Sequence, residues 1–446
     1  MTVITPITPI KQELKQVSRR GFITNLEGSR RGFITNYPNP TQWNPLNETD
    51  VMSREPLNIY VHIPFCAQQC SYCYYRVVTG AKRDEMNRYA DALCQEMAMA
   101  AERYNLKDRP IRSIYFGGGT PTMLQREQLE RITQGIRDNF NHIMPNAEFT
   151  IEGEPVSMTQ KTADAFRDLP IPVTRISMGV QSLDDDVVKH TQRKDTVDRV
   201  IKAINIAQSV VPNVNIDLMS GLAGETMETW QNSVHRALET GVASITVYKT
   251  EVYANSQYFR DLRKSKIRLP DDDEELRYFE YAVDAFEKAN YKPWSFFAYT
   301  KNGDYPHVHA PSLWRGEDYL PLGTSAFGKI GDQLFQNSND PEKYMQTIES
   351  GHFAVNRGHK LTCQDKMVRT VLVGMKLMKL DLDFFQQATG YRLEKLCAPM
   401  VNELQENGFI TLNGGEKPTE LVMTRKGILH GDYVGKQLGR ALQELG

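Results

Sequence analysis

The sequence lacks several features that would place it in common classes of protein. No apolar run approaches the roughly 20 residues that a helix needs to span a bilayer, and the first residues do not follow the charged-then-apolar order of a secretory signal. Lys and Arg number 53 against 55 Asp and Glu, for a net charge of -2, and the two signs are interleaved without a basic stripe. We therefore expect a cytoplasmic protein with neither a membrane nor a nucleic acid as partner.

Cysteine is also scarce, with six residues in a chain of 446. So few thiols in a chain of this length do not indicate a disulfide framework. Three of them nevertheless fall close together, Cys66, Cys70 and Cys73 in "FCAQQCSYCYY", directly after the strand-like run "LNIYVHIPF". A closed metal site takes four protein ligands, whereas three thiolates can hold a 4Fe-4S cluster and leave one iron open to a small molecule. The spacing therefore favours a reactive cluster over a structural one.

From residue 57 onward, short apolar runs rich in β-branched residues alternate with longer amphipathic stretches. The expected strands are 58–63, 113–118, 148–153, 173–179, 213–219 and 244–250, and the expected helices are 83–104, 125–140, 196–211 and 227–241. Strict alternation predicts an α/β fold with a parallel sheet and right-handed crossovers. Six such units favour a partial or closed barrel, in which the chemistry lies at the C-terminal ends of the strands.

The composition divides the chain into four parts. Residues 1–56 are polar and contain "SRRGFITN" twice, so we expect a flexible arm, with an artefact of gene prediction or a partner-binding arm as alternatives. Residues 57–270 form the expected barrel. Residues 271–361 begin with a long helix and continue into aromatic-rich irregular sequence, which we expect to extend the barrel and contribute to a substrate pocket. Residues 362–446 are predicted to form a small helical and winged cap with one hairpin.

These motifs together resemble the radical S-adenosylmethionine (SAM) superfamily, and "YVHIPFC" is similar to its oxygen-independent coproporphyrinogen oxidase, or HemN-like, branch. The resemblance continues through "YFGGGTPT", "FTIEGEP", "RISMGVQSL", "NIDLMSGL", "LWRGEDYLPLG" and "LDLDFFQQATG". It implies a partial (β/α)6 barrel, SAM bound to the open iron, and reductive cleavage of SAM to a 5'-deoxyadenosyl radical. It also implies a flavodoxin-type reductase as electron donor.

The same resemblance implies which residues surround the cofactors. A tyrosine is expected beside the cluster, where it is also the candidate catalytic residue, and a glycine run lets the backbone approach SAM closely. A glutamate is expected to accept hydrogen bonds from the SAM amine or ribose, and an arginine to pair with the methionine carboxylate. The implied residues are Tyr60, Gly117, Gly118, Gly119, Thr120, Glu152, Gln181, Arg193 and Asp217.

A zinc site completed by His62 is the alternative use of the three cysteines. It would leave the ordered series of downstream motifs without an explanation, so we favour the cluster. The remaining cysteines, at positions 94, 363 and 397, are expected to behave as small hydrophobic residues without a role in chemistry.

Three reactions compete at such a site. Tyr74 and Tyr75 after the cysteines, and Pro293 where a carboxylate usually stands, depart from the pattern of the coproporphyrinogen decarboxylases. "IEGEP" and "YLPLGTSAFGKIG" resemble the anaerobic haem-degrading methyltransferases and, more loosely, natural-product methylating and cyclopropane-forming enzymes. The sequence therefore predicts radical C-methylation of an unsaturated planar small molecule by two SAM molecules. Oxidative decarboxylation of coproporphyrinogen, and haem carriage with His307 or His309 as axial ligand in a loop, remain the alternatives.

The aromatic residues between positions 291 and 327 suit the wall of a pocket for a planar substrate. By composition, ordinary core packing between barrel and cap explains them equally well.

Overall fold

The computed structural model describes residues 36–45 and 56–445. A 12-stranded sheet forms its centre, in the order β14-β13-β12-β11-β1-β4-β5-β6-β7-β8-β10-β9. The strands from β11 to β8 in this order run parallel to one another. They are β11 (Asp318–Leu322), β1 (Leu57–Ile63), β4 (Ile111–Gly118), β5 (Ile143–Gly153), β6 (Arg175–Gln181), β7 (Val214–Ser220) and β8 (Ser244–Lys249). Each of the six predicted strands is present.

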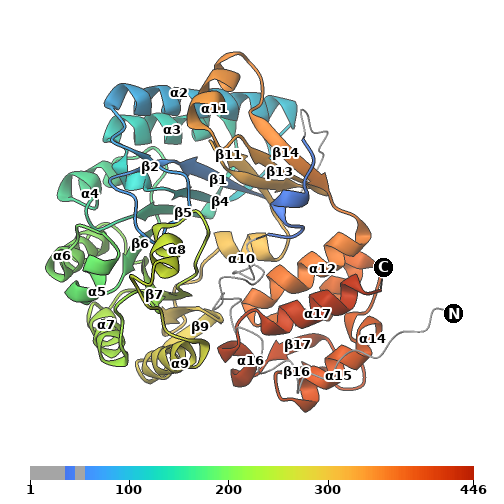
Figure 1. Cartoon of the computed structure of the whole chain (residues 1–446). Coiled ribbons are helices and arrows are strands. Elements are labelled where there is room, and N and C mark those ends of the chain that lie inside the picture. Colours follow the sequence, from blue (N-terminus) through green and yellow to red (C-terminus); the bar gives the residue numbers. More distant parts are fainter. Residues whose placement is uncertain (1–35, 46–55, 446) are drawn as a thin grey trace.

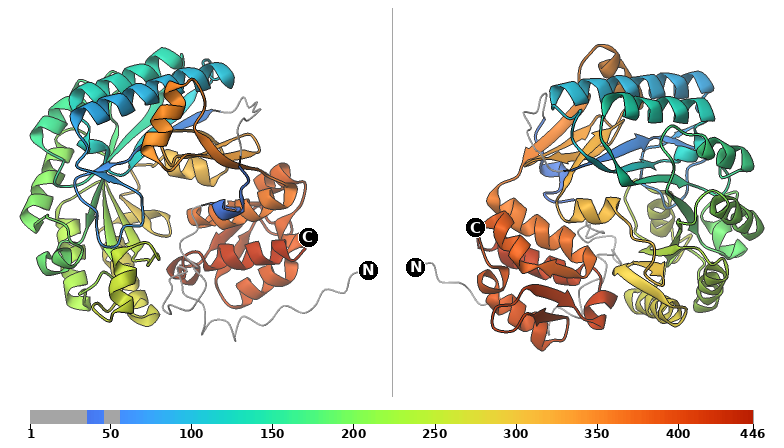
Figure 2. Two further views of the ribbon diagram at one scale, coloured as in Figure 1. Left: turned by 45° about the horizontal axis from the view of Figure 1, so that its top comes forward. Right: turned by 180° about the vertical axis from the view of Figure 1, so that it is seen from behind.

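Antiparallel strands extend the parallel sheet at both ends. One end carries β10 (Ala298–Lys301) and β9 (Tyr291–Ser295), and the other carries β12 (Phe327–Ile330), β13 (Gln333–Asn337) and β14 (Val355–Lys360). The two edge strands, β9 and β14, do not pair with each other, so the sheet is a partial barrel, as the sequence predicts. Figure 2 shows the helices as an arc outside the curved sheet and the C-terminal part of the chain at the open side.

Helices cover the outer face of the sheet. They are α2 (Arg83–Arg103), α3 (Arg126–Asn139), α4 (Gln160–Arg167), α6 (Val197–Gln208), α7 (Met227–Glu239) and α9 (Asp272–Lys288), and α11 (Pro341–Glu349) packs on α2. Shorter elements lie in the connections: η1 (Pro40–Gln42), β2 (Phe65–Cys66), β3 (Val78–Thr79), η2 (Pro121–Met123), α5 (Asp185–His190), α8 (Gln257–Arg263) and α10 (His309–Trp314). The alternation of strand and helix follows the predicted order (Figure 1).

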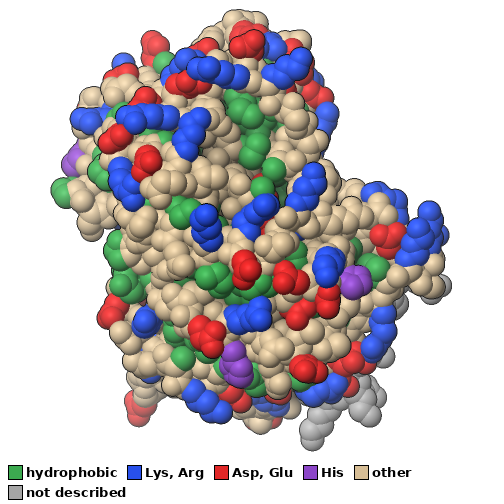
Figure 3. Space-filling model, turned by 90° about the vertical axis from the view of Figure 1, so that its left-hand side faces the viewer, with side chains coloured by type: hydrophobic (Ala, Val, Ile, Leu, Met, Phe, Trp, Pro, Cys, Tyr) green, Lys and Arg blue, Asp and Glu red, His purple; other side chains and the backbone are tan. Residues whose placement is uncertain are grey.

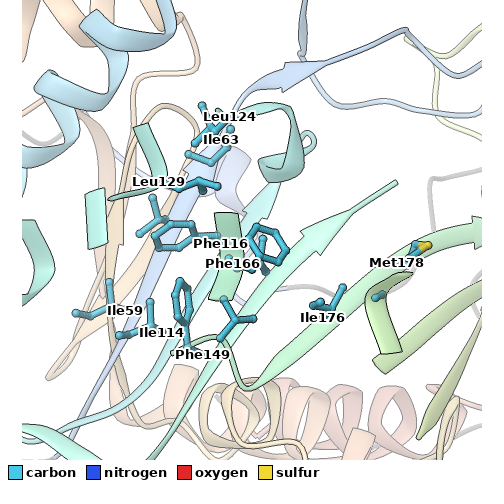
Figure 4. Packing of buried hydrophobic residues seen from close by; sticks show 14 of the residues in the cluster. Ile59, Ile63, Ile114, Phe116, Leu124, Leu129, Phe149, Phe166, Ile176 and Met178 are labelled. Carbon is cyan, nitrogen blue, oxygen red and sulfur yellow. The ribbon is translucent and has the colours of Figure 1, made fainter. Parts of the chain in front are cut away.

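The parallel strands alternate between an apolar outer face and a polar inner face. Outward residues such as Ile59, Ile114 and Phe149 pack in the hydrophobic layer under the helices (Figure 4). The residues between them, such as Asn58 and Ser113, are also buried but polar. A parallel sheet covered on both faces usually consists of nearly continuous apolar runs. The polar inner face therefore marks the barrel interior as the place for chemistry.

The C-terminal part has a hydrophobic core of its own. Its elements are α12 (Cys363–Gly374), η3 (Met375–Leu377), β15 (Lys379–Asp381), α13 (Leu382–Thr389), α14 (Leu393–Leu396), α15 (Ala398–Glu406), β16 (Ile410–Asn413), β17 (Glu420–Met423), α16 (Arg425–Leu429) and α17 (Tyr433–Gln443). The predicted hairpin is β16–β17, which β15 extends to three strands. Helix α10 contacts both β4 and α12 and so connects this part to the barrel.

Two segments differ from what the sequence predicts. The aromatic-rich stretch expected to be irregular contains strands β9 to β13, because its short strands are interrupted by turns that hide their alternation. Within the expected flexible arm, residues 36–45 pack on the protein: Trp43 is buried against Leu334 and Leu361, and Asn44 bridges to Gly358. The duplicated motif lies outside the described residues except for its last residue, Asn36.

Basic and acidic side chains are intermixed on the face of the molecule shown in Figure 3, without a continuous patch of either sign. Within residues 36–45 and 56–445, no helix combines the length and the apolar character needed to cross a membrane.

Candidate active site

The three cysteines lie on a loop that is fastened at several points. Cys66 ends β2, which pairs in parallel with β3, so both ends of the loop are held together. In the middle of the loop, the N–H of Ser71 donates to the carbonyl of Thr191 (3.1 Å), and the carbonyl of Ser71 accepts from the N–H of Tyr258 (2.9 Å). The loop is therefore fixed between the connections that follow β6 and β8.

Burial keeps the three thiols protonated, and metal binding would remove these protons. Burial raises the pKa of Cys66 to about 12 and that of Cys73 to about 11. Burial also raises the pKa of Cys70, while the nearby Arg193 guanidinium opposes this effect. A metal must displace these protons to bind the thiolates. Its positive charge would then stabilise the buried negative charges of the three thiolates.

The three thiols fit an iron-sulfur cluster better than a single ion. Among the described residues, no group of three His, Cys, Asp or Glu side chains converges on one metal-ion position. A 4Fe-4S cluster binds each thiolate at a different iron, so its ligands need not converge. His62, the fourth ligand of the zinc alternative, instead has its Nδ1 within 3.1 Å of the Tyr60 hydroxyl.

The glycine run at the end of β4 lies against the chain that leads into Cys66. The N–H of Gly119 donates to the carbonyl of Ile63 (2.7 Å), and the N–H of Thr120 donates to the carbonyl of Phe65 (2.8 Å). A Cβ on Gly119 would lie 2.8 Å from each of these two carbonyl oxygens. The Thr120 hydroxyl lies 3.4 Å from Cys66 Sγ. These contacts place Gly119 and Thr120 beside the cysteine loop, where the sequence predicts them.

Glu152 lies at the end of β5 beneath the glycine run. Its Oε1 accepts a hydrogen bond from the Tyr115 hydroxyl (2.5 Å), and its Oε2 accepts from the N–H of Gly118 (3.1 Å). A Cβ on Gly117 would lie 2.9 Å from Glu152 Oε2. Burial raises the pKa of Glu152 to about 7, against the opposing effect of the Tyr115 hydrogen bond. The carboxyl is thus ready to ionise when a cation such as the SAM ammonium approaches.

On the prediction that Glu152 accepts a hydrogen bond from the SAM ammonium, this pKa would make SAM affinity dependent on pH. Below about pH 7 Glu152 is neutral and cannot form a charge-assisted bond, so we expect the SAM dissociation constant to rise up to about tenfold per pH unit below that pH. The Glu152→Gln variant should bind SAM more weakly, by about 1.5–3 kcal/mol at pH 7.5, and lose this dependence. Isothermal titration calorimetry on reconstituted protein measures both quantities.

Asp217→Asn is the control for that experiment. Asp217 also faces the barrel interior, near Arg175 and Tyr115, and burial raises its pKa to about 6. Protonation of Asp217 should affect the plot of SAM affinity against pH at a lower pH than protonation of Glu152 does. The same pH dependence in wild type and Glu152→Gln would show that another group carries it.

The other predicted polar residues lie on the same rim. The Arg193 Nε donates to Asp195 Oδ2 (3.0 Å), and its Nη1 reaches the Tyr72 hydroxyl (3.4 Å). Gln181 has a positive φ of 70°, and its Nε2 lies over Gly179, where a Cβ would meet it at 2.8 Å. The same Cβ would lie 4.0 Å from Arg193 Nη1, so Gln181 and Arg193 converge above Gly179.

A cavity of about 1030 Å³ opens beside the cysteine loop. Three of the predicted site residues, Tyr60, Cys70 and Cys73, contribute to its wall, while the other predicted residues lie outside that lining. Its lining contains Arg76, Arg260 and Arg357 and no acidic side chain. The cavity is thus electropositive and adjoins two of the three thiols.

Sequence reasoning missed one carboxylate at the site. Glu154, two residues after Glu152, approaches Cys66 and Arg193 closely enough to influence their environment, and burial raises its pKa. Its Oε1 is buried without a hydrogen-bond partner, which suits an acceptor for an ammonium group. The second glutamate of "IEGEP" was the available signal. This orphaned oxygen is the observation that best fits SAM to the residues present.

The structure decides two points about the segment after residue 290 that the sequence leaves open. His307 and His309, the candidate axial ligands of a haem carrier, are buried in the barrel interior, and the Ser113 hydroxyl lies 2.8 Å from His309 Nδ1. Of the two explanations for the aromatic residues between positions 291 and 327, core packing applies to most of them, for example Trp294 on Trp314, and only Phe327 among them lines the cavity.

Comparison with known proteins agrees with this geometry. Residues 60–237 match the model of the radical SAM superfamily, and residues 361–430 match the HemN C-terminal domain. The heme chaperone HemW of Haemophilus influenzae is 30% identical over 299 residues, which cover 65% of this chain and 76% of that protein. The chain belongs to the HemN/HemW family of radical SAM proteins.

Two further relatives of this HemN/HemW protein show the breadth of the family. The oxygen-independent coproporphyrinogen III oxidase of Helicobacter pylori is 27% identical over 352 residues, 76% of each chain. The solved structure of coproporphyrinogen III oxidase (HemN) from Escherichia coli, a radical SAM enzyme, superposes with a TM-score of 0.73 at 24% identity and covers 87% of this chain and 90% of that one. The family uses a 4Fe-4S cluster and SAM, so these cofactors are those of the present site.

Proposed function

We propose that this protein is a radical SAM enzyme that acts on a tetrapyrrole carrying carboxylate side chains. The electropositive cavity beside Cys70 and Cys73 is the observation that carries the proposal. Its volume of about 1030 Å³ lies at the upper end of the range for ligand pockets and suits a large planar molecule. The names of the relatives, a coproporphyrinogen III oxidase and a heme chaperone, both concern tetrapyrroles.

The arginines of the cavity favour an anionic substrate. Arg357 donates to the neutral Gln336 (2.8 Å), and Arg260 donates to the neutral Gln257 (2.8 Å). Arg76 forms an ion pair with Asp340, which does not itself line the cavity. Guanidinium groups bind carboxylates with two parallel hydrogen bonds, so the first two are available to substrate side chains.

When bound, the cluster and SAM supply a 5'-deoxyadenosyl radical that abstracts a hydrogen atom from the substrate. The residues of the chain position and protect this chemistry. Tyr60 lines the cavity between the cysteine loop and the barrel interior, and it stacks on Tyr115 at 6.1 Å. Burial raises the pKa of Tyr60 well above its usual value, so it stays protonated and can donate a hydrogen bond.

Methyl transfer from a second SAM molecule gains no support from the relatives, which are oxidases and heme chaperones. The tyrosines that depart from the decarboxylase pattern nevertheless lie at the site. Tyr74, next to Cys73, stacks between Tyr75, with ring centroids 4.2 Å apart, and Tyr253, with ring centroids 3.9 Å apart. Haem carriage through His307 or His309 is disfavoured, because both imidazoles lie in the barrel interior and not in the cavity lining. We therefore place radical oxidation of the tetrapyrrole first.

Product analysis separates the three reactions. Reduced, reconstituted protein is incubated with methyl-deuterated SAM and either coproporphyrinogen III or haem, and nucleoside products are measured by mass spectrometry. We expect 5'-deoxyadenosine to form faster with a tetrapyrrole than without it, and no S-adenosylhomocysteine. S-adenosylhomocysteine produced in step with turnover would restore methyl transfer. Tight haem binding without either product would identify a haem carrier.

A further inference from the structure

Arg175 begins β6 and turns its side chain into the barrel interior, since its neighbour Ile176 packs in the outer hydrophobic layer. The residue is 4% exposed, and its Nη1 is buried without a hydrogen-bond partner. Burying a guanidinium costs several kcal/mol unless an anion and hydrogen bonds compensate it. An arginine in this condition indicates a partner that the described part of the chain does not provide.

The carboxylates of the barrel interior are bonded to other groups. Each of them accepts a hydrogen bond from a neutral donor: Glu148 from the N–H of Val308 (2.7 Å), Glu152 from the Tyr115 hydroxyl (2.5 Å) and Asp217 from the Asn215 amide (2.8 Å). Arg175 acts on the pKa values of Glu152 and Asp217 through space, but the described residues include no ion pair between them. The guanidinium is therefore near these groups without being bound by them.

Further unpartnered polar atoms lie near the same place. His309 Nε2, His307 Nδ1 and Trp294 Nε1 are buried without hydrogen-bond partners. The rings of Trp294 and His307 lie 5.1 Å apart, and Arg175 influences the pKa of both imidazoles. Burial lowers the pKa of His309 to about 3, so the imidazole is neutral. Because the Ser113 hydroxyl donates to Asn58 (2.6 Å), it accepts from the Nδ1–H of His309, and His309 Nε2 is an acceptor. The unpartnered donors that an anion could use here are Arg175 Nη1 and Trp294 Nε1, together with the neutral His307, whose Nε2 also lies 3.4 Å from Glu148.

This cluster lies next to the cavity. Tyr60, which lines the cavity, stacks on Tyr115 at 6.1 Å, and Tyr115 stacks on His309 at 4.8 Å. One aromatic layer thus separates the cavity from Arg175 and His309. With the ring of a substrate in the cavity, a short side chain would have to pass this layer to reach Arg175.

We propose that Arg175, with Trp294 and His307, binds one carboxylate of the substrate at the floor of the barrel. The planar guanidinium matches the two oxygens of a carboxylate. The proposal rests on the proposed function, because it assumes that the substrate carries a carboxylate on a short chain. The cofactor has a separate candidate for its own carboxylate, Arg193, which lies beside Cys70.

The test compares Arg175→Met with Arg112→Met. Arg112 lies on β4 and pairs with Glu317 (2.7 Å) outside the cluster, so it controls for the loss of an arginine. Coproporphyrin III and its tetramethyl ester are the probes, followed by fluorescence quenching. We expect Arg175→Met to weaken binding of the acid about tenfold or more and binding of the ester little, while Arg112→Met changes neither. We also expect Arg175→Met to melt at or above the wild-type temperature, since it removes an uncompensated buried charge.

Three results would overturn the proposal. These are equal affinity of wild type and Arg175→Met for the acid, equal losses for acid and ester, and a loss of SAM affinity in Arg175→Met, which would assign the guanidinium to the cofactor. Line broadening of ¹³C-labelled propionate separates this proposal from the proposed function. If wild type binds no tetrapyrrole but broadens the propionate signal, and Arg175→Met does not, the carboxylate site stands and the substrate class is wrong. If wild type neither binds a tetrapyrrole nor broadens the propionate signal, Arg175 does not form a carboxylate site.

Discussion

Replacing Cys66, Cys70 or Cys73 with Ala removes the iron-sulfur cluster and, with it, all cleavage of SAM. Each thiol binds a separate iron, so the loss of one leaves the cluster with two protein ligands. The loop itself should survive the change, because the backbone bonds of Ser71 and the β2–β3 pairing hold it without the thiols. We expect iron and sulfide to fall from about four per chain to near zero, and 5'-deoxyadenosine to fall below detection in the dithionite assay.

The matched control is Cys94→Ala. Cys94 lies on α2, where its Sγ is 3.5 Å from the carbonyl of Arg131, outside the cysteine loop. This variant should retain iron, sulfide and SAM cleavage at wild-type levels. A cysteine-loop variant that kept a full cluster, or stoichiometric zinc without iron in anaerobically purified wild type, would contradict the assignment of the metal site.

The second large effect is expected for Gly118→Ala. Gly118 has a φ of +107°, and an added Cβ would lie 2.4 Å from Cε1 of His62. Moving the His62 ring aside would disrupt its contact with the Tyr60 hydroxyl, which lies within hydrogen-bonding distance of Nδ1. Backbone strain and overpacking together should lower the free energy of unfolding by about 2–4 kcal/mol. SAM binding should also weaken, because the N–H of Gly118 orients Glu152.

Gly316→Ala isolates the backbone contribution. Gly316 also has a positive φ, +85°, but an added Cβ would meet no atom within 4 Å. We expect it to lower the free energy of unfolding by about 1 kcal/mol and to leave SAM affinity unchanged. Urea unfolding of both variants measures the difference, and equal destabilisation would show that the His62 contact costs nothing.

The barrel and the cysteine loop could be predicted from the sequence because their signals are local. Strands such as β4 and β7 carry the apolar alternation within their own residues, and the three cysteines need only their spacing to define a site. Glycines 117 to 119 lie beside the loop because a parallel sheet brings the ends of neighbouring strands together.

The remaining features depend on distant parts of the chain. His309 reaches the barrel interior because the segment between β10 and β11 crosses beneath strands that precede it by about 200 residues, a path that no local pattern encodes. That Arg175 forms no ion pair with Glu152 or Asp217 can likewise be recognised only when the hydrogen-bond donors to these two carboxylates are known. β11, "DYLPL", contains a proline, which in sequence argues against a central strand.

The alternation along the parallel strands has an evolutionary consequence. Packing depends on outward residues such as Ile114 and Phe149, whereas recognition depends on their inward neighbours, so one set can change without disturbing the other. A scaffold divided in this way can acquire a new substrate through a few inward replacements, at little risk to its folding. This separation is consistent with a solved structure that retains this architecture at only 24% sequence identity.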